Sequence, residues 1–404
     1  MTAPTVEKEI LSETMLERFR ERAPGYDQEN KFFQEDFEEL RDAGYLKIAI
    51  PTEFGGGGMN LAQVSLQQRR LAYYAPADAV AVNMHIYWTG LAADMYRVGD
   101  TSLEWLLKEA AAGEIFAAGH SERGNDIVAL LSTTNAERAE GGWKLTGHKN
   151  FGTMTPVWTR MGVHGMDTSD PAAPKIVHAF MKRDADGIEI VETWDSLGMR
   201  ATRSDDTILD GVFIPDEYIA RVNPAGAAGL DLYVLGIFAW ALVGFANIYY
   251  SIGRRMLDLT LDYLPTKTSL GLGGQSYDHH PAIQHAVAEM IMRCDAMEPH
   301  LNAVAEGYSA SVAQAGSWTP HQEGPGWVSK IVGLKEIVSR EALAVSNLAV
   351  EAVGGLGVAK KSEFERLLRD ARMGPIHPAN PALSHELVAK INLGIDLDAQ
   401  PRWA

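Results

Sequence analysis

The chain has 404 residues, of which 46% are hydrophobic, and its formal net charge is −17. A chain of this length can bury a substantial core in two or three domains, and its acidic balance without basic runs argues against a nucleic-acid partner. A single cysteine, Cys294, excludes an internal disulfide, and because the N-terminal segment lacks the pattern of a secretion signal, we expect a cytoplasmic protein.

The spacing of apolar residues changes twice along the chain. Over residues 1–116 apolar residues recur at helical spacing, which predicts an N-terminal helical domain. Residues 117–222 alternate, with Gly141-Gly142 at a hairpin turn, and this pattern predicts a β domain. Residues 223–404 return to long helical patterns, which are typical of a bundle. The predicted fold class is therefore α+β, mostly α.

One uncharged segment of eighteen residues, Tyr233–Tyr250, is about as long as the shortest membrane-spanning helix. Charged residues flank it, Asp231 before it and Arg254 after it, and Asn247 interrupts it. A helix that is apolar on all sides is also typical of the interior of a large bundle. We therefore predict a buried helix and no membrane partner.

Motifs in the same order indicate one family. The segments are GYLKIAIPTEFGGGGMN, HSERGND, LTGHKNFGTM, LGMRATRSDDTILDGVFIP and YLPTKTSLG, followed by a glycine turn at 354–357 and by Arg369-Asp370-Ala371. From about residue 44 to residue 394 the chain resembles the acyl-CoA dehydrogenases. The resemblance implies an N-terminal helical domain, a central β-barrel domain, a C-terminal four-helix bundle and an FAD cofactor.

The resemblance assigns three residues to the flavin ring. Ser121 and its backbone would hold the pyrimidine edge, Phe151 would pack beside the ring, and Thr153 would form a hydrogen bond near N5. These residue types suit a flavin, which needs hydrogen-bonding groups at N1/O2 and N5 and an aromatic or apolar face. Ordinary strand residues are the alternative interpretation of the same positions.

The resemblance also places the adenine end of FAD at a subunit interface. Lys267 replaces the family's arginine, and it supplies positive charge without the planar fork. Gly354 and Gly355 form the accompanying turn, and Asn380 is assigned to the cofactor as well. A shared site of this kind implies a homotetramer or a homodimer.

The proton-abstracting residue of the family is missing. Its glutamate position holds Pro378, and the second known position holds Ala241, so neither has a titratable group. His377, next to the missing glutamate, is the first candidate for proton transfer because the pKa of an imidazole lies near 6.5. Tyr233 and Glu122 are the other candidates. Alternatively, His377 only packs before a proline turn.

Three functions remain open. The first is α,β-dehydrogenation of an acyl-CoA or related thioester by a non-standard base, with electrons passing to a flavoprotein acceptor. The second follows from a similarity to flavin-dependent monooxygenases related to dibenzothiophene monooxygenase, in which a histidine stands eight residues after an arginine, as His377 follows Arg369. These enzymes use reduced flavin and O2, and they need no such base. The third is a non-catalytic flavin-binding paralogue.

The substrate residues are predicted less specifically. His85 corresponds to a histidine in the first domain of the monooxygenases, and Trp240 with Phe238 and Phe245 would line a pocket for a short, branched, cyclic or aromatic substrate. Core packing explains these aromatic residues equally well. No metal is expected, because His279-His280 has no third ligand at metal spacing.

Overall fold

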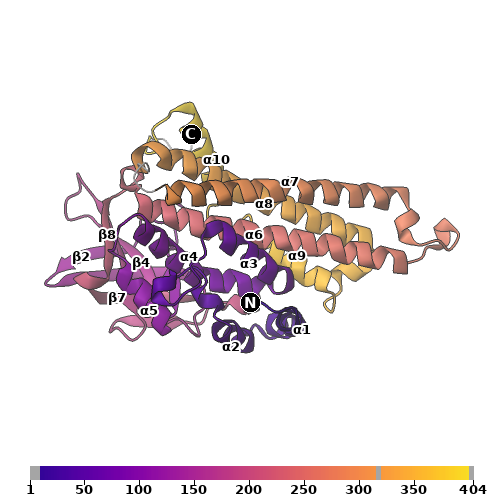
Figure 1. The fold of residues 1–404 in the computed structure, drawn as a ribbon, viewed down its shortest axis with the longest axis horizontal. Coiled ribbons are helices and arrows are strands. Elements are labelled where there is room, and N and C mark those ends of the chain that lie inside the picture. The colour runs from indigo at the N-terminus through magenta and orange to yellow at the C-terminus, as the bar shows by residue number, and fades with distance from the viewer. Residues whose placement is uncertain (1–9, 315–319, 400–404) are drawn as a thin grey trace, which may run out of the picture.

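The computed structural model describes residues 10–314 and 320–399. Helices, then strands, then helices follow one another along the chain (Figure 1). The first group is α1 (Glu13–Glu29), α2 (Gln34–Asp42), α3 (Leu61–Tyr74), α4 (Pro76–Arg97) and α5 (Glu104–Ala112). The last group is α6 (Leu232–Tyr263), α7 (Pro281–Ala313), α8 (Pro320–Val353), α9 (Glu363–Met373) and α10 (Pro381–Leu393).

Eight strands lie between these groups and form one mixed sheet. They are β1 (Phe116–Gly119), β2 (Asn135–Ala139), β3 (Gly142–Gly152), β4 (Arg160–Asp167), β5 (Lys175–Lys182), β6 (Ile188–Val191), β7 (Asp205–Pro215) and β8 (Ile219–Pro224). Their order is β6-β7-β3-β2-β4-β5-β8, and β1 pairs with β4. The β2–β3 hairpin turns at Glu140-Gly141, one residue earlier than predicted, because Gly142 already pairs with Ala139.

The apolar segment forms most of the long helix α6, which lies inside the molecule. The Asp231 side chain caps its N-terminus by accepting a hydrogen bond from the Val234 amide at 2.9 Å. By length and composition alone, two helices of the described residues could cross a membrane, at 232–266 and 324–358. In the first, 89% of the most apolar window is buried against the rest of the protein, as expected for a core helix.

The helix α4 joins the sheet to the bundle. On one side, the Trp88 indole donates a hydrogen bond to the Ala117 carbonyl of β1 at 2.9 Å and packs edge-on against Phe180 of β5. On the other side, Gly90 lets the Trp240 ring of α6 approach so closely that a Cβ at position 90 would lie 2.3 Å from it. The helices α6, α7 and α8 then run side by side away from the sheet (Figure 1).

Candidate functional site

An aromatic side chain stands exposed where β3 ends. The pairing of β3 with β7 is irregular between Lys149 and Gly152, and Phe151 within this stretch has a φ of 58°. Such a backbone directs the side chain out of the sheet. The Phe151 ring is 61% exposed, with Trp194 edge-on at 6.1 Å between ring centroids. An accessible aromatic edge of this kind can pack beside a planar ring system.

The Thr153 hydroxyl next to it belongs to a chain of three hydroxyl groups. Thr202 donates its proton to the Met199 carbonyl at 2.9 Å, and the Ser204 oxygen lies 2.8 Å from the Thr202 oxygen. The Thr153 oxygen lies 2.8 Å from that of Ser204. Because Thr202 uses its only proton on Met199, Ser204 donates to Thr202, and the acceptors within reach of the Thr153 proton are Ser204 and, at 3.5 Å, the Phe151 carbonyl. The Thr153 oxygen is thereby left as a hydrogen-bond acceptor.

Ser121 lies beside these residues, after β1. Its carbonyl accepts a hydrogen bond from the Asn150 amide at 2.9 Å, which ties the loop to β3 one residue before Phe151. The side-chain oxygen of Asn150 is buried and has no hydrogen-bond partner within the described residues. The structure thus brings Ser121, Phe151 and Thr153 together where the inner strand β3 ends, which we call the flavin edge of the sheet.

Glu122 follows Ser121 and is wholly buried in an ion pair with Lys149, 2.6 Å from its Nζ. The hydroxyl groups of Ser132 and Thr134 donate to the carboxylate at 2.7 and 2.6 Å, and the Thr133 and Thr134 amides donate as well. Burial acts to raise the pKa of Glu122, but Lys149 and these hydrogen bonds lower it to about 2. Glu122 therefore anchors the loop and does not suit the role of a base at neutral pH.

His377 lies in the loop between α9 and α10, against α6. Its Nδ1 is 2.9 Å from the Tyr249 hydroxyl, and its ring centroid is 4.9 Å from that of Phe245. The Lys335 ammonium donates to the carbonyl groups of His377 and Ala379 and so fixes the loop. Burial and the charge of Lys335 lower the pKa of His377 to about 3. The imidazole is therefore neutral, and the pKa near 6.5 that motivated its prediction does not apply in this structure.

Tyr233, the second predicted proton-transfer residue, lies far from His377. Sixteen residues separate Tyr233 from Tyr249 on α6, which is about 24 Å at 1.5 Å per residue. The Tyr233 side chain is 1% exposed, burial raises the pKa of its hydroxyl well above 10, and its ring packs edge-on against His178. The two residues do not form one catalytic pair, and Tyr249 takes the place beside His377.

Both predicted substrate residues are held by other groups. The Nε2 atom of His85 lies 3.0 Å from the Leu46 carbonyl, and its Nδ1 accepts a hydrogen bond from the Phe116 amide at 3.1 Å. Both ring nitrogens therefore join backbone segments, so contact with a substrate would require one of these bonds to break. The Trp240 indole donates to Asp94 at 2.7 Å inside the core.

The Asp94 carboxylate makes stability depend on pH. Burial raises its pKa from 3.8 to about 6, against the opposing effects of Arg97 and Trp240. A raised pKa in the folded state stabilises the protein at low pH, and this contribution is lost as the pH rises through about 6. Relative to Asp94→Asn, the wild-type protein should lose about 2 kcal/mol of unfolding free energy between pH 4 and pH 7. Urea unfolding of both proteins at pH 4 and pH 7 measures this loss. A difference in unfolding free energy between wild type and Asp94→Asn that is the same at both pH values would contradict the raised pKa of Asp94.

The residues assigned to the adenine end cap two helices. The Lys267 ammonium donates to the Val353 carbonyl at 2.9 Å and lies 3.9 Å from the centre of the Tyr277 ring. Gly354 ends α8 with a φ of 70°, beside this ammonium. Asn380 caps α10 by accepting a hydrogen bond from the Leu383 amide at 2.9 Å.

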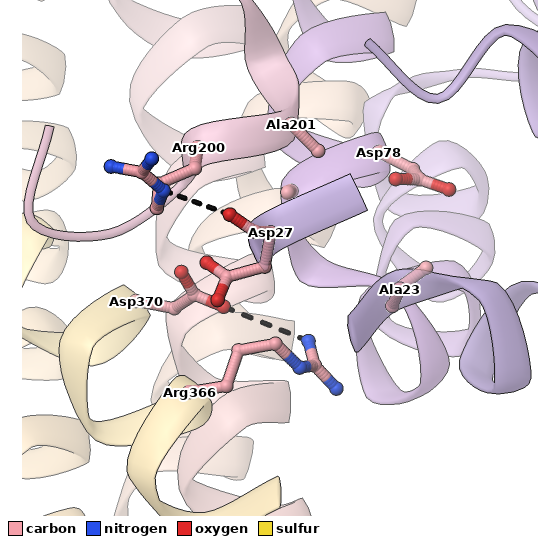
Figure 2. Close-up of a pocket in the computed structure, with 9 residues that line it drawn as sticks. Ala23, Asp27, Asp78, Arg200, Ala201, Arg366 and Asp370 are labelled. Atoms are coloured by element: carbon pink, nitrogen blue, oxygen red, sulfur yellow. Dashed lines mark hydrogen bonds and ion pairs between the residues drawn. The ribbon is translucent and has the colours of Figure 1, made fainter. Parts of the chain in front are cut away.

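A buried network of charges connects the ends of several elements (Figure 2). It surrounds a cavity of about 10 Å³, which is the size of one water molecule. Arg200 donates to the Asp27 carbonyl at 2.8 Å, Arg366 lies 3.8 Å from Asp370, and Asp370 accepts from the Met199 amide at 2.6 Å. Burial raises the pKa of Asp370 to about 6. The network has a structural role, since its charges face one another.

A larger groove of about 470 Å³ lies next to this network. It is lined by Asp27, Gln28, Ser196, Leu197, Arg200, Lys360 and Arg369. Its cations are already paired within the described residues, with Arg369 bonded to Asp27 and Glu365, and Lys360 bonded to Glu365. Neither cavity is lined by the residues assigned to the flavin.

Comparisons with known proteins find matches along most of the chain. Two family models match, "Acyl-CoA dehydrogenase, N-terminal domain" over residues 8–104 and "Acyl-CoA dehydrogenase, C-terminal domain" over residues 238–381. The chain is 26% identical to the putative acyl-CoA dehydrogenase YdbM of Bacillus subtilis (strain 168) over 383 residues, covering 93% of this chain and 94% of YdbM. It is 24% identical to the dibenzothiophene monooxygenase of Rhodococcus qingshengii over 369 residues, covering 90% and 88%.

Among solved structures, the chain is similar to KijD3 in complex with FMN and dTDP-3-amino-2,3,6-trideoxy-4-keto-3-methyl-D-glucose. The TM-score is 0.84 at 22% sequence identity, and the match covers 96% of this chain and 93% of KijD3. The fold class predicted from the sequence is confirmed by this likeness.

Proposed function

The chain belongs to the acyl-CoA dehydrogenase superfamily of flavin-dependent oxidoreductases, as its motifs predicted, and from this premise we propose that it is a monooxygenase that uses reduced flavin and dioxygen. The direction of the hydroxyl chain carries the proposal. The Thr153 oxygen is left to accept a hydrogen bond, because its own proton points to Ser204, its nearer acceptor, the Ser204 proton points to Thr202 and the Thr202 proton points to the Met199 carbonyl. By resemblance Thr153 faces flavin N5, which bears a hydrogen in reduced flavin and a bare lone pair in oxidised flavin. Thr153 therefore suits reduced flavin.

The groups around His377 give independent support. Dehydrogenation of a thioester needs a base for the α proton, but Pro378 and Ala241 occupy the two base positions and Glu122 is held as a carboxylate with a pKa of about 2. The neutral His377 imidazole, bonded to Tyr249, offers its Nε2 atom for a hydrogen bond. A reaction that requires hydrogen bonding, with no strong base, fits these residues.

The residues at the edge of the sheet fit a flavin ring. Phe151 presents an exposed aromatic face, and Asn150 has a buried side-chain oxygen without a partner among the described residues. Ser121, Phe151 and Thr153 would hold the ring, and bound reduced flavin would supply the two electrons that activate dioxygen. Lys267 and the turn at Gly354 are proposed to meet the rest of the cofactor, whether FMN or FAD.

The substrate is proposed to be a small molecule. KijD3 binds FMN and a dTDP-amino sugar, and dibenzothiophene monooxygenase is named for an aromatic sulfur compound. We propose a substrate with an oxidisable nitrogen, sulfur or aromatic carbon. We also propose a homodimer or homotetramer, because the family's cofactor site lies between subunits. A cytoplasmic location is a further part of the proposal.

Acyl-CoA dehydrogenation is the second candidate. The chain matches YdbM over 94% of YdbM's length, and YdbM is described as a putative acyl-CoA dehydrogenase. The turn at Gly354-Gly355 beside the Lys267 ammonium also resembles the FAD-binding turn of that branch. In this case a displaced group would remove the α proton, and a flavoprotein would accept the electrons.

One experiment separates the two candidates. Flavin-loaded protein is mixed anaerobically with a panel of acyl-CoA thioesters, and separately, after chemical reduction, with ¹⁸O₂ and a panel of aromatic sulfur compounds, indoles and nucleotide-linked amino sugars. We expect no bleaching of oxidised flavin near about 450 nm by any thioester, and ¹⁸O in a product by mass spectrometry. Bleaching by an acyl-CoA would establish the dehydrogenase instead.

A single substitution tests the hydroxyl chain itself. Ser204→Ala removes the nearer acceptor of the Thr153 proton and leaves only the long contact of 3.5 Å to the Phe151 carbonyl, so Thr153 can then donate to the bare N5 of oxidised flavin. We expect the ratio of the Kd values for oxidised and reduced FMN to fall about tenfold, which corresponds to one hydrogen bond. Fluorescence titrations under argon measure both constants, with Ser196→Ala in the neighbouring loop as the control. An unchanged ratio would remove the directional argument.

A further inference from the structure

Three histidines gather in the interior between the sheet and the helices α4 and α6. His164 of β4 and His178 of β5 are opposite one another in register, with ring centroids 6.0 Å apart. His120, after β1, lies 5.1 Å from His164, and Tyr233 of α6 lies 5.1 Å from His178. The Tyr87 hydroxyl of α4 is 3.4 Å from His120 Nδ1. We call these five side chains the histidine chamber.

The chamber contains five buried polar atoms without a hydrogen-bond partner in the described part of the chain. They are His120 Nε2, His164 Nδ1, both ring nitrogens of His178, and the Tyr233 hydroxyl. An unpaired buried polar group costs about 1–3 kcal/mol, and nearly all such groups in proteins bind either protein atoms or ordered water. Five of them around the same rings point to internal water molecules that connect them.

The three imidazoles are neutral. Burial lowers the pKa of His120 and His178 to about 3 and that of His164 well below 6.5, and the nearby Lys149 charge acts in the same direction. The Glu122 carboxylate acts to raise the pKa of His120, and the Glu122 Oε2 atom is 3.9 Å from His164 Nε2. A neutral imidazole has one N–H and one bare nitrogen, so it can accept a proton on one side and donate one on the other. At His164 the N–H is that of Nε2, which donates to the Leu131 carbonyl at 3.0 Å, so this residue offers only its bare Nδ1 to water.

One end of the chamber lies near solvent. The Arg221 guanidinium is 5.7 Å from the Tyr233 ring centre, and it pairs with Asp231 at 3.3 Å and with Asp100. The side chain of Asp100 is 37% exposed. The Tyr233 end of the chamber therefore lies beside an ion cluster that reaches the surface.

The other end faces the proposed flavin and substrate site. His120 directly precedes Ser121, the residue assigned to the flavin. Tyr87 lies one helical turn from Asn83, whose side chain donates to the Ala241 carbonyl at 3.4 Å on the helix that carries the predicted substrate residues. The chamber thus spans the interior from the surface ion cluster to the site.

We propose that His178 and His120, with Tyr233 and with ordered water at the bare His164 Nδ1, conduct protons from the Arg221 surface to the flavin site. The proposal rests on the proposed monooxygenase function. In that reaction substrate, dioxygen, anionic reduced flavin and one proton give oxygenated substrate, water and oxidised flavin. Without substrate, dioxygen, anionic reduced flavin and one proton give hydrogen peroxide and oxidised flavin. Each turnover consumes one proton at the flavin, beside Thr153, which is buried.

The test follows the oxidation of reduced flavin bound to the whole protein. Air-saturated buffer is mixed with FMN-loaded, chemically reduced protein by stopped flow, in H₂O and in D₂O. His178→Gln keeps hydrogen bonding but cannot exchange protons between two ring nitrogens. Tyr233→Phe removes only the hydroxyl. We expect both variants to oxidise about tenfold more slowly with a larger solvent isotope effect. His148→Gln, on β3 beside Asp206 and partly exposed, is the matched control and should match the wild type.

The outcomes separate the relay from the monooxygenase function. Wild-type rates and isotope effects in both variants, with normal FMN affinity, would overturn the relay. A wild-type protein that reduces dioxygen but never transfers ¹⁸O to a product would overturn the monooxygenase, while slowed variants would still support the relay. If His178→Gln fails to fold, Tyr233→Phe alone decides, because it removes one unpaired hydroxyl.

Discussion

Replacing Lys149 with methionine is expected to lower the free energy of unfolding by about 3–5 kcal/mol, because it leaves the buried Glu122 carboxylate without its cation. Both side chains are 0% exposed, and the Lys149 ammonium also donates to the His164 carbonyl at 2.6 Å. Burial lowers the pKa of Lys149 to about 8 although Glu122 acts to raise it, so the lysine remains mostly charged at neutral pH. Urea unfolding followed by circular dichroism measures the loss.

Two further variants show that the loss comes from an uncompensated charge. Combining Lys149→Met with Glu122→Gln removes both charges, and it should restore part of the stability that the single change removes. Arg138→Met breaks the exposed pair with Asp216 in the same sheet and should have little effect. A Lys149→Met protein as stable as the wild type would mean that Glu122, once Lys149 no longer lowers its pKa, takes up a proton at little cost.

Replacing His377 with alanine is expected to reduce turnover by about 10²-fold or more, while FMN affinity stays within a few-fold of the wild type. The imidazole is the polar group next to the missing glutamate position, and removing one positioned hydrogen-bonding group at a reacting centre costs about 10²–10³ in rate. Tyr249→Phe, which removes only the partner of Nδ1, should have a smaller effect. Steady-state kinetics with the substrate found in the ¹⁸O₂ panel measures both variants.

The pH profile distinguishes a hydrogen-bonding role from a proton-transfer role. Because the pKa of His377 is lowered to about 3, this residue should cause no inflection in turnover between pH 5 and pH 8. An inflection near pH 6.5 that disappears in His377→Asn would instead show that the imidazole titrates during the reaction. Wild-type turnover in His377→Ala would exclude the residue from the mechanism altogether.

The fold was predictable because local patterns repeat through whole elements. Helical and alternating periodicities gave the order of helices and strands, and the uncharged segment gave α6. The helical rise separates Tyr233 from the Ala241 position by about 12 Å, so the sequence alone could have shown that Tyr233 lies away from that base position.

The electrostatics of the site could not be predicted in the same way. The pKa of His377 depends on Lys335, which is 42 residues earlier, and that of Glu122 depends on Lys149, 27 residues later. The pairing of His164 with His178 needs the register of β4 and β5, which no motif specifies. The sequence did not mark Lys335 as a buried cation, since Glu336 follows it directly in α8.

The Asp27 carboxylate gives the first helix an influence on a loop near the other end of the chain. Asp27 binds Arg369 with both carboxylate oxygens, and Arg369 lies eight residues before His377 on the helix that leads into its loop. Helix α1 therefore helps to hold in place the helix that leads to His377. Because Asn30 at the end of α1 also donates to the Trp194 carbonyl, and Trp194 packs on Phe151, a displacement of α1 should disturb both the His377 loop and the flavin edge.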